Sequence, residues 1–326
     1  MVERELQSGL ESRLENGLES GLESGLGLVV SLDRGFPLVR TSRGEERAQH
    51  SIDLVKNADI RACVGDEVEL VEEPGQDTPF ITSIRARTST LVRRELVESI
   101  HEGAGKVNEQ VLAANFDFVA IVQGLGKRTL DLNYLERQLV MAFESGAEVI
   151  IILTKADLAR HLEEDHAAVK AVFPEGTVLC RALTDAHEDL AQCFYPDRLG
   201  VLFGRSGVGK STLINLLLGE ERLITARVRK KDHAGRHTTV ARRLIDLPDG
   251  GAVIDTPGMR AIGVHGAELG LARTFPEIEL YAHECYYRNC THTHEPDCAV
   301  EAAVEAGLIV KRRLASYLDL ASEVFD

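Results

Sequence analysis

Apolar and polar residues alternate over short distances in the first structured part of the chain. Between residues 27 and 88, brief apolar or alternating runs are separated by turn-forming residues, for example Glu-Pro-Gly at 73–75. Runs of this length and spacing are typical of strands joined by tight turns. About five such strands predict a small β-barrel over residues 27–90, with an OB-fold as the first interpretation.

The pattern changes after residue 110. Short, wholly apolar runs alternate with longer segments of helical periodicity, such as 132–144 and 211–218. Continuous apolar runs are typical of parallel strands buried on both faces. The runs are Phe116–Val122, Val149–Leu153, Leu199–Phe203 and Ala252–Ile254. We therefore predict a doubly wound α/β domain over residues 91–264 and a mostly helical domain over 265–326.

The first 26 residues follow neither pattern. A Gly-Leu-Glu-Ser unit recurs with a four-residue step, which would stack its leucines on one face of a helix. The glycines of the repeat each cost roughly 1 kcal/mol in a helix interior. We predict a disordered tail over residues 1–26, with a partner-binding helix as the alternative.

Composition limits the classes of function. The chain of 326 residues has 37 Lys and Arg against 52 Asp and Glu, a net charge of −15. This balance argues against binding nucleic acid over the whole surface, because phosphate contact requires clustered basic side chains. The sequence shows no signal-peptide pattern and no apolar run near the ~20 residues of a membrane span. We expect a cytoplasmic protein without membrane contact.

The strongest motif is a phosphate-binding loop between an apolar strand and a helix. Residues 204–211 match the pattern G-x-x-x-x-G-K-[ST] in full. Backbone N–H groups of such a loop surround phosphate, and the helix N-terminus adds partial positive charge. Lys210 should contact the β- and γ-phosphates, and the Ser211 hydroxyl should bind Mg²⁺. The predicted phosphate contacts are Gly204, Arg205, Ser206, Gly207, Val208, Gly209, Lys210, Ser211 and Thr212.

Two further segments complete the expected magnesium and γ-phosphate contacts. Asp255 ends an apolar strand in the sequence Asp-Thr-Pro-Gly. Its carboxylate can hold Mg²⁺, and the N–H of Gly258 can detect the γ-phosphate, because glycine allows close backbone approach. Between the two motifs, Thr238 is the predicted switch threonine that binds Mg²⁺, with Thr239 as the alternative.

A Thr-Lys-Ala-Asp sequence stands at the end of another predicted strand and is a variant of the Asn-Lys-x-Asp guanine motif. The Asp157 carboxylate can accept hydrogen bonds from both N1–H and N2–H of guanine, a donor pair that adenine lacks. The stem of Lys155 would cover the ring, and Thr154 replaces the usual Asn. Ala182 is the candidate for a backbone N–H contact to guanine O6, although Arg181 precedes it where Ser is usual.

The guanine motif precedes the phosphate loop, which reverses the usual order in GTPases. The same sheet can form if the old ends are joined and the chain is opened elsewhere, because domain termini often lie close together. In this order the segment after Asp255 runs almost directly into the C-terminal domain. We therefore predict that loss of the γ-phosphate can move that domain as a body.

A cluster of cysteines indicates a metal site in the C-terminal domain. Cys285, Cys290 and Cys298 provide three thiolates, and His292 or His294 provides an imidazole. Four protein ligands leave no open position for water, so we predict one structural Zn²⁺.

Basic residues are concentrated in one block of this acidic chain. Residues 222–243 contain eight Lys and Arg against one Asp, a local charge of 8 − 1 = +7. We predict contact with RNA there, with a solvated loop as the alternative. A smaller cluster allows either phosphate contact or a solvated linker. Its members are Arg85, Arg87, Arg93 and Arg94.

Together these motifs resemble a known family. The order Thr-Lys-x-Asp, the phosphate loop, Gly-Arg-His-Thr-Thr, Asp-Thr-Pro-Gly and C-x4-C-x-H-x5-C is similar to that of the small ribosomal subunit biogenesis GTPase RsgA (YjeQ) family. The resemblance covers about residues 28–326, and its supporting fragments are 64–66, 114–117 and 292–296. The acidic tail and Arg181 depart from the family pattern.

The resemblance implies an OB-fold, a circularly permuted GTPase domain and a zinc domain with His292 as fourth ligand. It also implies a factor that hydrolyses GTP to GDP slowly, is stimulated by the 30S subunit, binds 16S rRNA and acts in late subunit maturation. We expect a monomer. Met259 follows Gly258 and cannot orient the attacking water. His237 resembles the proposed catalytic His of the family and would act with Lys210 and Thr238, whereas the alternative role of His237 is contact with rRNA phosphate.

Two other functions stay open from the sequence. One is a nucleotide-gated RNA-binding checkpoint module in which turnover is incidental. The other is a permuted GTPase that serves the large ribosomal subunit.

Overall fold

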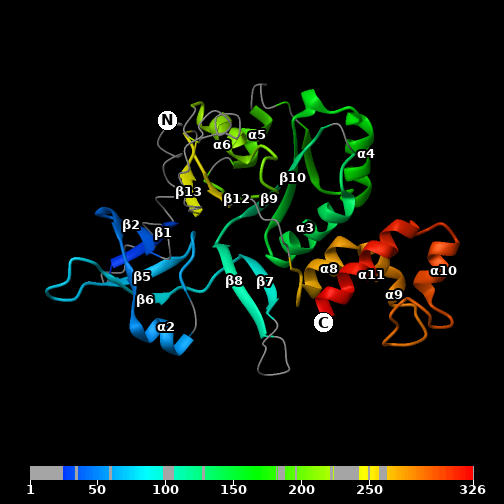
Figure 1. Cartoon of the computed structure of the whole chain (residues 1–326), viewed down its shortest axis with the longest axis horizontal. Helices are drawn as coiled ribbons and strands as arrows, with labels where there is room; N and C mark the ends of the chain where they lie inside the picture. Colours follow the sequence, from blue (N-terminus) through cyan, green and yellow to red (C-terminus); the bar gives the residue numbers. More distant parts are fainter. Residues whose placement is uncertain are drawn as a thin grey trace, which may run out of the picture.

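The computed structural model arranges the chain in three parts, with the strands of the N-terminal part on one side, the central sheet in the middle and the C-terminal helices on the other side (Figure 1). It describes residues 25–33, 36–58, 61–97, 106–126, 129–180, 182, 188–194, 197–220, 223, 242–248, 250–256 and 263–325. Some residues selected above lie outside these ranges. They are Arg181, His237, Thr238, Thr239 and Gly258, together with the tail up to residue 24 and most of the basic block.

The N-terminal part consists of short strands whose pairing returns to its starting point. β1 pairs with β2 and with β5, β5 pairs with β6, and β6 pairs in parallel with β4. β3 pairs with β2, and a single residue, Ala48, separates β3 from β4, so the chain itself joins the two ends of this order into a ring. The elements are β1 (Gly25–Asp33), β2 (Phe36–Thr41), β3 (Gly44–Arg47), β4 (Gln49–His50), α2 (Ile52–Ala58), β5 (Glu67–Val71) and β6 (Phe80–Ile84). β1 begins at Gly25 rather than at residue 27.

The ring encloses a small aliphatic core. Every second residue of β5 is buried, and β1 and β2 also alternate in part, as expected for strands with one solvated face. The core residues are Val29, Val39, Ala48, Ala62, Val68, Leu70 and Ile81.

The central part contains the parallel strands that the apolar runs predicted. Its strand order is β11-β10-β9-β12-β14-β13, with β13 antiparallel at the end. The strands are β9 (Phe118–Gly124), β10 (Glu148–Thr154), β11 (Thr177–Cys180), β12 (Leu199–Phe203), β13 (Arg242–Asp246) and β14 (Ala252–Asp255). The helical segments of this part are α3 (Leu132–Glu144), η1 (Ala156–Leu158), α4 (Leu162–Val172), α5 (Glu188–Phe194) and α6 (Lys210–Leu218).

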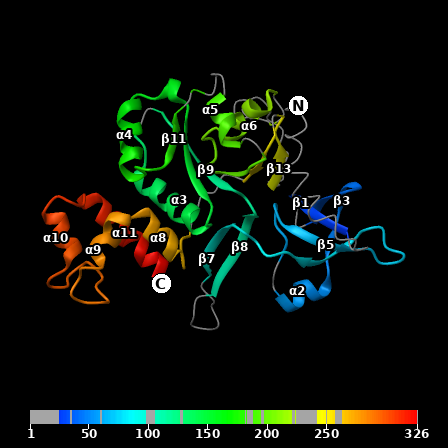
Figure 2. The same ribbon diagram turned by 180° about the vertical axis from the view of Figure 1, so that it is seen from behind.

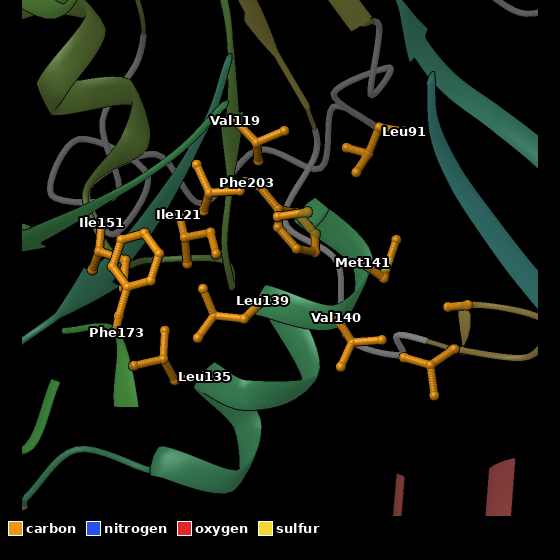
Figure 3. Packing of buried hydrophobic residues seen from close by; sticks show 14 of the residues in the cluster. Leu91, Val119, Ile121, Leu135, Leu139, Val140, Met141, Ile151, Phe173 and Phe203 are labelled. Carbon is orange, nitrogen blue, oxygen red and sulfur yellow. The ribbon is translucent and has the colours of Figure 1, made fainter. Parts of the chain in front are cut away.

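Helices cover both faces of this sheet, which explains its continuous apolar runs. On β9, Val119 and Ile121 face a core that includes Leu135 and Leu139 of α3 (Figure 3). The alternate residues of β9 face a second core, to which α5 and α6 contribute. Successive side chains of a strand point to opposite faces of the sheet, so a strand covered on both faces needs apolar residues at both odd and even positions.

Two connections join the N-terminal strands to the central sheet. β1 pairs antiparallel with β13, so both sets of strands form one continuous sheet. The chain then passes through a separate hairpin, β7 (Thr90–Val97) and β8 (Lys106–Ala114), which lies between the two parts in both views (Figure 2). Asn115, which follows the hairpin, donates to Gly65 O at 2.9 Å and accepts the Thr88 N–H at 2.9 Å. Two fragments that supported the family resemblance therefore meet at this joint.

The C-terminal part is helical, as predicted, and packs against α3. Its helices are α8 (Glu268–Thr274), α9 (Pro276–Ala282), α10 (Ala299–Glu305) and α11 (Lys311–Phe325). The Glu144 carboxylate of α3 accepts the Gly270 N–H of α8 at 2.8 Å. Glu136 of α3, which is fully buried, accepts hydrogen bonds from two arginines of α11.

Candidate functional site

The parallel strands bring the predicted nucleotide motifs to one edge of the sheet. β10, β12 and β14 run in the same direction, and each is followed directly by one of the motifs. Their carboxyl ends therefore lie together, where open α/β sheets bind ligands.

The phosphate loop follows β12 and opens α6, as the motif requires. Gly207 and Gly209 have φ angles of 81° and 114°, a backbone conformation that residues other than glycine rarely adopt. The buried Lys210 ammonium donates to Gly204 O at 2.8 Å and to Arg205 O at 3.2 Å. Burial lowers the pKa of Lys210, and the negative charge of Asp255 opposes that change.

The guanine motif is docked directly on the phosphate loop. The Thr154 hydroxyl donates to Val208 O at 2.5 Å, and the Lys155 ammonium donates to Gly207 O at 2.5 Å. Lys155 has a left-handed backbone conformation, with φ at 59°. The hydroxyl of Thr154 thus acts as a hydrogen-bond donor to the loop.

The other two candidate guanine contacts, Asp157 and Ala182, follow neighbouring strands. Asp157 lies in η1 and is exposed, one turn beyond Lys155. Ala182 follows β11, which pairs with β10, and is half-buried. Both residues follow the carboxyl ends of neighbouring strands, β10 and β11, at the edge of the sheet where the guanine motif lies.

Gly124 contacts the phosphate loop but belongs to none of the sequence motifs. Gly124 ends β9, and a Cβ at this position would lie 3.2 Å from the Val208 Cα and 3.3 Å from its carbonyl oxygen. Glycine therefore lets β9 pass close to the phosphate loop without displacing Val208. The neighbouring Gln123 O accepts the Thr154 hydroxyl at 3.2 Å, so the same strand end also supports the guanine motif.

The predicted magnesium residues come from the start of α6 and from the end of β14, the strand beside β12. Ser211 is the second residue of α6. Asp255 is half-buried at the end of β14 and pairs in register with Leu202 of β12. The buried Thr256 hydroxyl donates to Leu202 O at 2.6 Å, which fixes this turn to β12. A hydroxyl and a carboxylate beside a phosphate loop are a donor set that fits Mg²⁺.

The cysteine cluster has the size of a tetrahedral zinc site. One ligand atom from each of four residues, Cys285, Cys290, His292 and Cys298, lies within 4.8 Å of all the others. Cys285 Sγ is 3.9 Å from Cys298 Sγ, close to the ~3.8 Å that two Zn–S bonds of about 2.3 Å span in a tetrahedron. The Nδ1 atom of His292 is 3.6 Å and 3.5 Å from these two sulfurs. His294 is exposed and lies outside the cluster.

The loop that carries His292 is shaped by one carboxylate. Glu295 accepts the Thr291 N–H at 2.8 Å, the Thr291 hydroxyl at 2.7 Å and the His294 N–H at 3.2 Å. Hydrogen bonds from Thr291 lower the pKa of Glu295. Burial lowers the pKa of His292, which favours the neutral imidazole that a metal requires.

Two members of the small arginine cluster form contacts within the protein, and Arg94 links two of its parts. Arg87 forms an ion pair with the fully buried Asp66, with N–O distances of 2.7 and 2.8 Å. Arg94 pairs with Glu109 at 2.7 Å and also donates to two carbonyl oxygens just before α8. Arg85 pairs with Glu67 at 3.5 Å and is 42% exposed, as a solvated segment allows, whereas Arg87 and Arg94 are held by contacts within the protein.

Among the described residues, no helix has the length and apolar character that a membrane span requires.

A phosphate loop that meets a Thr-Lys-x-Asp turn at the carboxyl edge of this sheet, in reversed chain order, defines a circularly permuted P-loop GTPase. The chain belongs to the RsgA GTPase family, because residues 84–265 match the sequence profile of that family.

Individual relatives agree with this assignment. The small ribosomal subunit biogenesis GTPase RsgA of Streptomyces avermitilis is 38% identical over 305 residues, which are 91% of this chain and 79% of the relative. The protein of the same name from Methanosarcina acetivorans is 40% identical over 263 residues, 80% of this chain and 69% of the relative.

Two solved structures share the fold. YjeQ from Thermotoga maritima has a TM-score of 0.66 and 21% identity, over 92% of this chain and 98% of that chain. YloQ, described as a circularly permuted GTPase, has a TM-score of 0.61 and 23% identity, over 94% and 96%. These likenesses confirm the predicted permuted GTPase fold.

Proposed function

We propose that this GTPase acts in late maturation of the small ribosomal subunit and hydrolyses GTP to GDP and phosphate when it is bound to the 30S subunit. The observation that carries the proposal is the docking of the guanine motif on the phosphate loop, through Thr154 and Lys155. This arrangement suits a guanine nucleotide, and it occurs in a family whose named members include small-subunit biogenesis factors.

In the proposed site, Asp157 and Ala182 recognise guanine and Lys210 neutralises charge on the phosphates. Ser211 and Asp255 would hold Mg²⁺, which supplies charge neutralisation at the γ-phosphate. The buried position of Lys210 and the half-buried position of Asp255 beside it support these roles. Roles for His237 as water-positioning residue, Thr238 as magnesium ligand and Gly258 as γ-phosphate sensor rest on the sequence motifs.

We also propose that the N-terminal ring of strands is an OB-fold that contacts 16S rRNA together with the basic block. The closed pairing and the parallel contact of β4 with β6 support this assignment. The zinc cluster would hold the C-terminal domain together, since four protein ligands leave no open position. The proposed active form is a cytoplasmic monomer.

The test is the GTPase rate of the purified protein with and without purified 30S subunits. We expect acceleration by 30S and none by 50S subunits. Equal rates in all three conditions would remove the ribosomal proposal, and acceleration by 50S alone would favour a large-subunit factor. Measuring 30S binding with GTP, GDP and a non-hydrolysable analogue separates a GTPase from an RNA-binding checkpoint module, because only the GTPase needs hydrolysis for release.

A further inference from the structure

The second residue of the phosphate loop contacts a helix outside the nucleotide motifs. The Arg205 guanidinium carbon lies 3.5 Å from the centroid of the Tyr134 ring, and a guanidinium nitrogen lies 3.7 Å from the Asp131 carboxylate. Asp131 is the N-cap of α3 and accepts the Tyr134 N–H at 3.1 Å. One turn of α3 therefore supplies both partners of Arg205.

The Tyr134 ring is a fixed platform for this contact. Only 9% of Tyr134 is exposed, whereas the Arg205 side chain is 50% exposed. Cation–π contacts of an arginine with a tyrosine face change an equilibrium by about two- to thirtyfold, depending on how far water is excluded. A contact of this size on the phosphate loop is large enough to influence the shape in which the loop receives phosphate.

The next turns of α3 hold the C-terminal domain. Glu136 accepts from Arg312 and Arg313 of α11, and Arg137 forms an ion pair with Glu323 near the end of that helix. A single helix of thirteen residues thus contacts the phosphate loop at its start and α11 along its length.

We propose that Arg205 is a positioning residue that fixes the phosphate loop to α3, and that α3 thereby links nucleotide affinity to the position of the C-terminal domain. The inference rests on the proposed role of the loop as the nucleotide site. The pairing with Tyr134 and Asp131 restrains the backbone between Gly204 and Ser206, so less freedom is lost when the loop N–H groups surround phosphate. Loss of the pairing should therefore weaken binding rather than slow the chemical step.

The test measures the affinity of a fluorescent GDP, together with kcat and KM for GTP, in the full-length protein. Arg205→Gln and Tyr134→Leu should each raise the Kd for GDP and the KM for GTP about three- to tenfold, with kcat changed less than twofold. The double variant should be no weaker than the weaker single variant, because both changes remove one contact. Tyr134→Phe keeps the ring but loses the hydroxyl that interacts with Arg205, so its Kd for GDP should fall between those of the wild type and Tyr134→Leu.

The matched control is another stacked arginine at the opposite end of the sheet. Arg198 lies over Phe118 at 4.8 Å and pairs with Glu148 at 2.6 Å, just before β12 begins. Arg198→Gln removes a contact of the same kind and should leave the Kd for GDP unchanged. Thermal unfolding of each variant separates loss of affinity from loss of folding. Arg205→Gln changes a half-exposed side chain and should leave folding intact, so the test does not depend on the Tyr134 variants alone.

The link to the C-terminal domain has its own measurement. Glu323→Gln should raise the Kd for GDP about twofold in the wild type and have no effect in Tyr134→Leu, because the connection is already lost there. Wild-type affinity in both Arg205→Gln and Tyr134→Leu, with binding lost in Lys210→Ala, would overturn the inference and leave the proposed function intact. Failure of the wild type to bind GDP would overturn both.

Discussion

Replacing Glu136 by Gln tests how the C-terminal domain is held on the GTPase domain. The Glu136 carboxylate is fully buried in α3 and accepts hydrogen bonds from Arg312 at 2.7 and 2.9 Å, from Arg313 at 2.7 Å and from the Ser316 hydroxyl at 2.6 Å. The amide keeps the size of the side chain but removes its charge. The substitution therefore isolates the electrostatic part of this joint.

The expected cost follows from what the two arginines can do afterwards. Removing one partner of a buried ion pair typically costs about 3–5 kcal/mol. Arg312 is 37% exposed and can turn to water, and Arg313 keeps its pairing with Glu277 at 2.6 and 3.1 Å. We therefore expect the lower end, about 3 kcal/mol. For an unfolding unit of roughly 150–250 residues, this loss of stability corresponds to a fall in Tm of about 6–12 °C.

The assay is calorimetric unfolding at neutral pH, with Glu323→Gln as the control. That variant makes the same chemical change in an ion pair with Arg137, but Glu323 is 41% exposed, and exposed pairs contribute about 0–1 kcal/mol. If Glu136→Gln destabilises the protein no more than Glu323→Gln does, the buried network does not hold the joint and the reasoning is refuted.

The same network predicts a pH dependence. Burial tends to raise the pKa of Glu136, but hydrogen bonds from Arg312, Ser316 and Arg313 together outweigh it, and the pKa lies below its ordinary value of 4.5. A depressed pKa in the folded state gives stability that is present above the unfolded value and lost as the pH falls through the folded one. The difference in Tm between wild type and Glu136→Gln should therefore be constant above pH 5.5 or so and shrink below about pH 4.5.

Three further outcomes can be checked with the same preparations. Lys210→Ala removes the buried charge of the phosphate loop and should lower kcat/KM for GTP by about 10²–10³-fold; activity within tenfold of the wild type would contradict its role. Thr154→Val removes the hydroxyl that donates to Val208 O and should weaken GDP binding about fivefold or more, whereas Thr154→Ser should restore it. Purified protein should contain one zinc ion per chain, and Cys298→Ala should lose it and unfold the C-terminal helices first, a result that metal analysis and proteolysis would report.

Local sequence was sufficient to predict the nucleotide motifs, because their chemistry lies within a few consecutive residues. The phosphate loop lies between β12 and α6 as its pattern requires, and the four residues of the candidate zinc cluster come from one short segment. Gly124 was missed because its role depends on the approach of Val208, which lies more than eighty residues further along the chain. Isolated glycines carry no sign of their neighbours in space.

Charged residues show the same limit more clearly. Arg87 belongs to a run of arginines that could equally contact phosphate or water, yet it pairs with the buried Asp66. Nor does the periodicity of α3 reveal that Glu136 is buried, since a glutamate on a helix is normally solvated. Both cases depend on a partner from a distant segment, and a periodic pattern records only which positions are apolar.

The segment before α8 shows how the permuted order ties the nucleotide site to the rest of the molecule. Arg94 of β7 donates to the carbonyl oxygens of His265 and Gly266 at 3.3 and 3.2 Å, and the Gly266 N–H donates to Val324 O of α11 at 2.9 Å. A cavity of about 150 Å³ lies beside it, lined by Thr90, Val92, Arg94, Met141, Glu144, Gly263, Val264 and Ala267. This segment is hydrogen-bonded to both the hairpin and α11. A movement of the chain after β14 would therefore move the hairpin and α11 together. The body that responds to GTP hydrolysis should therefore include β7 and β8 as well as the C-terminal helices.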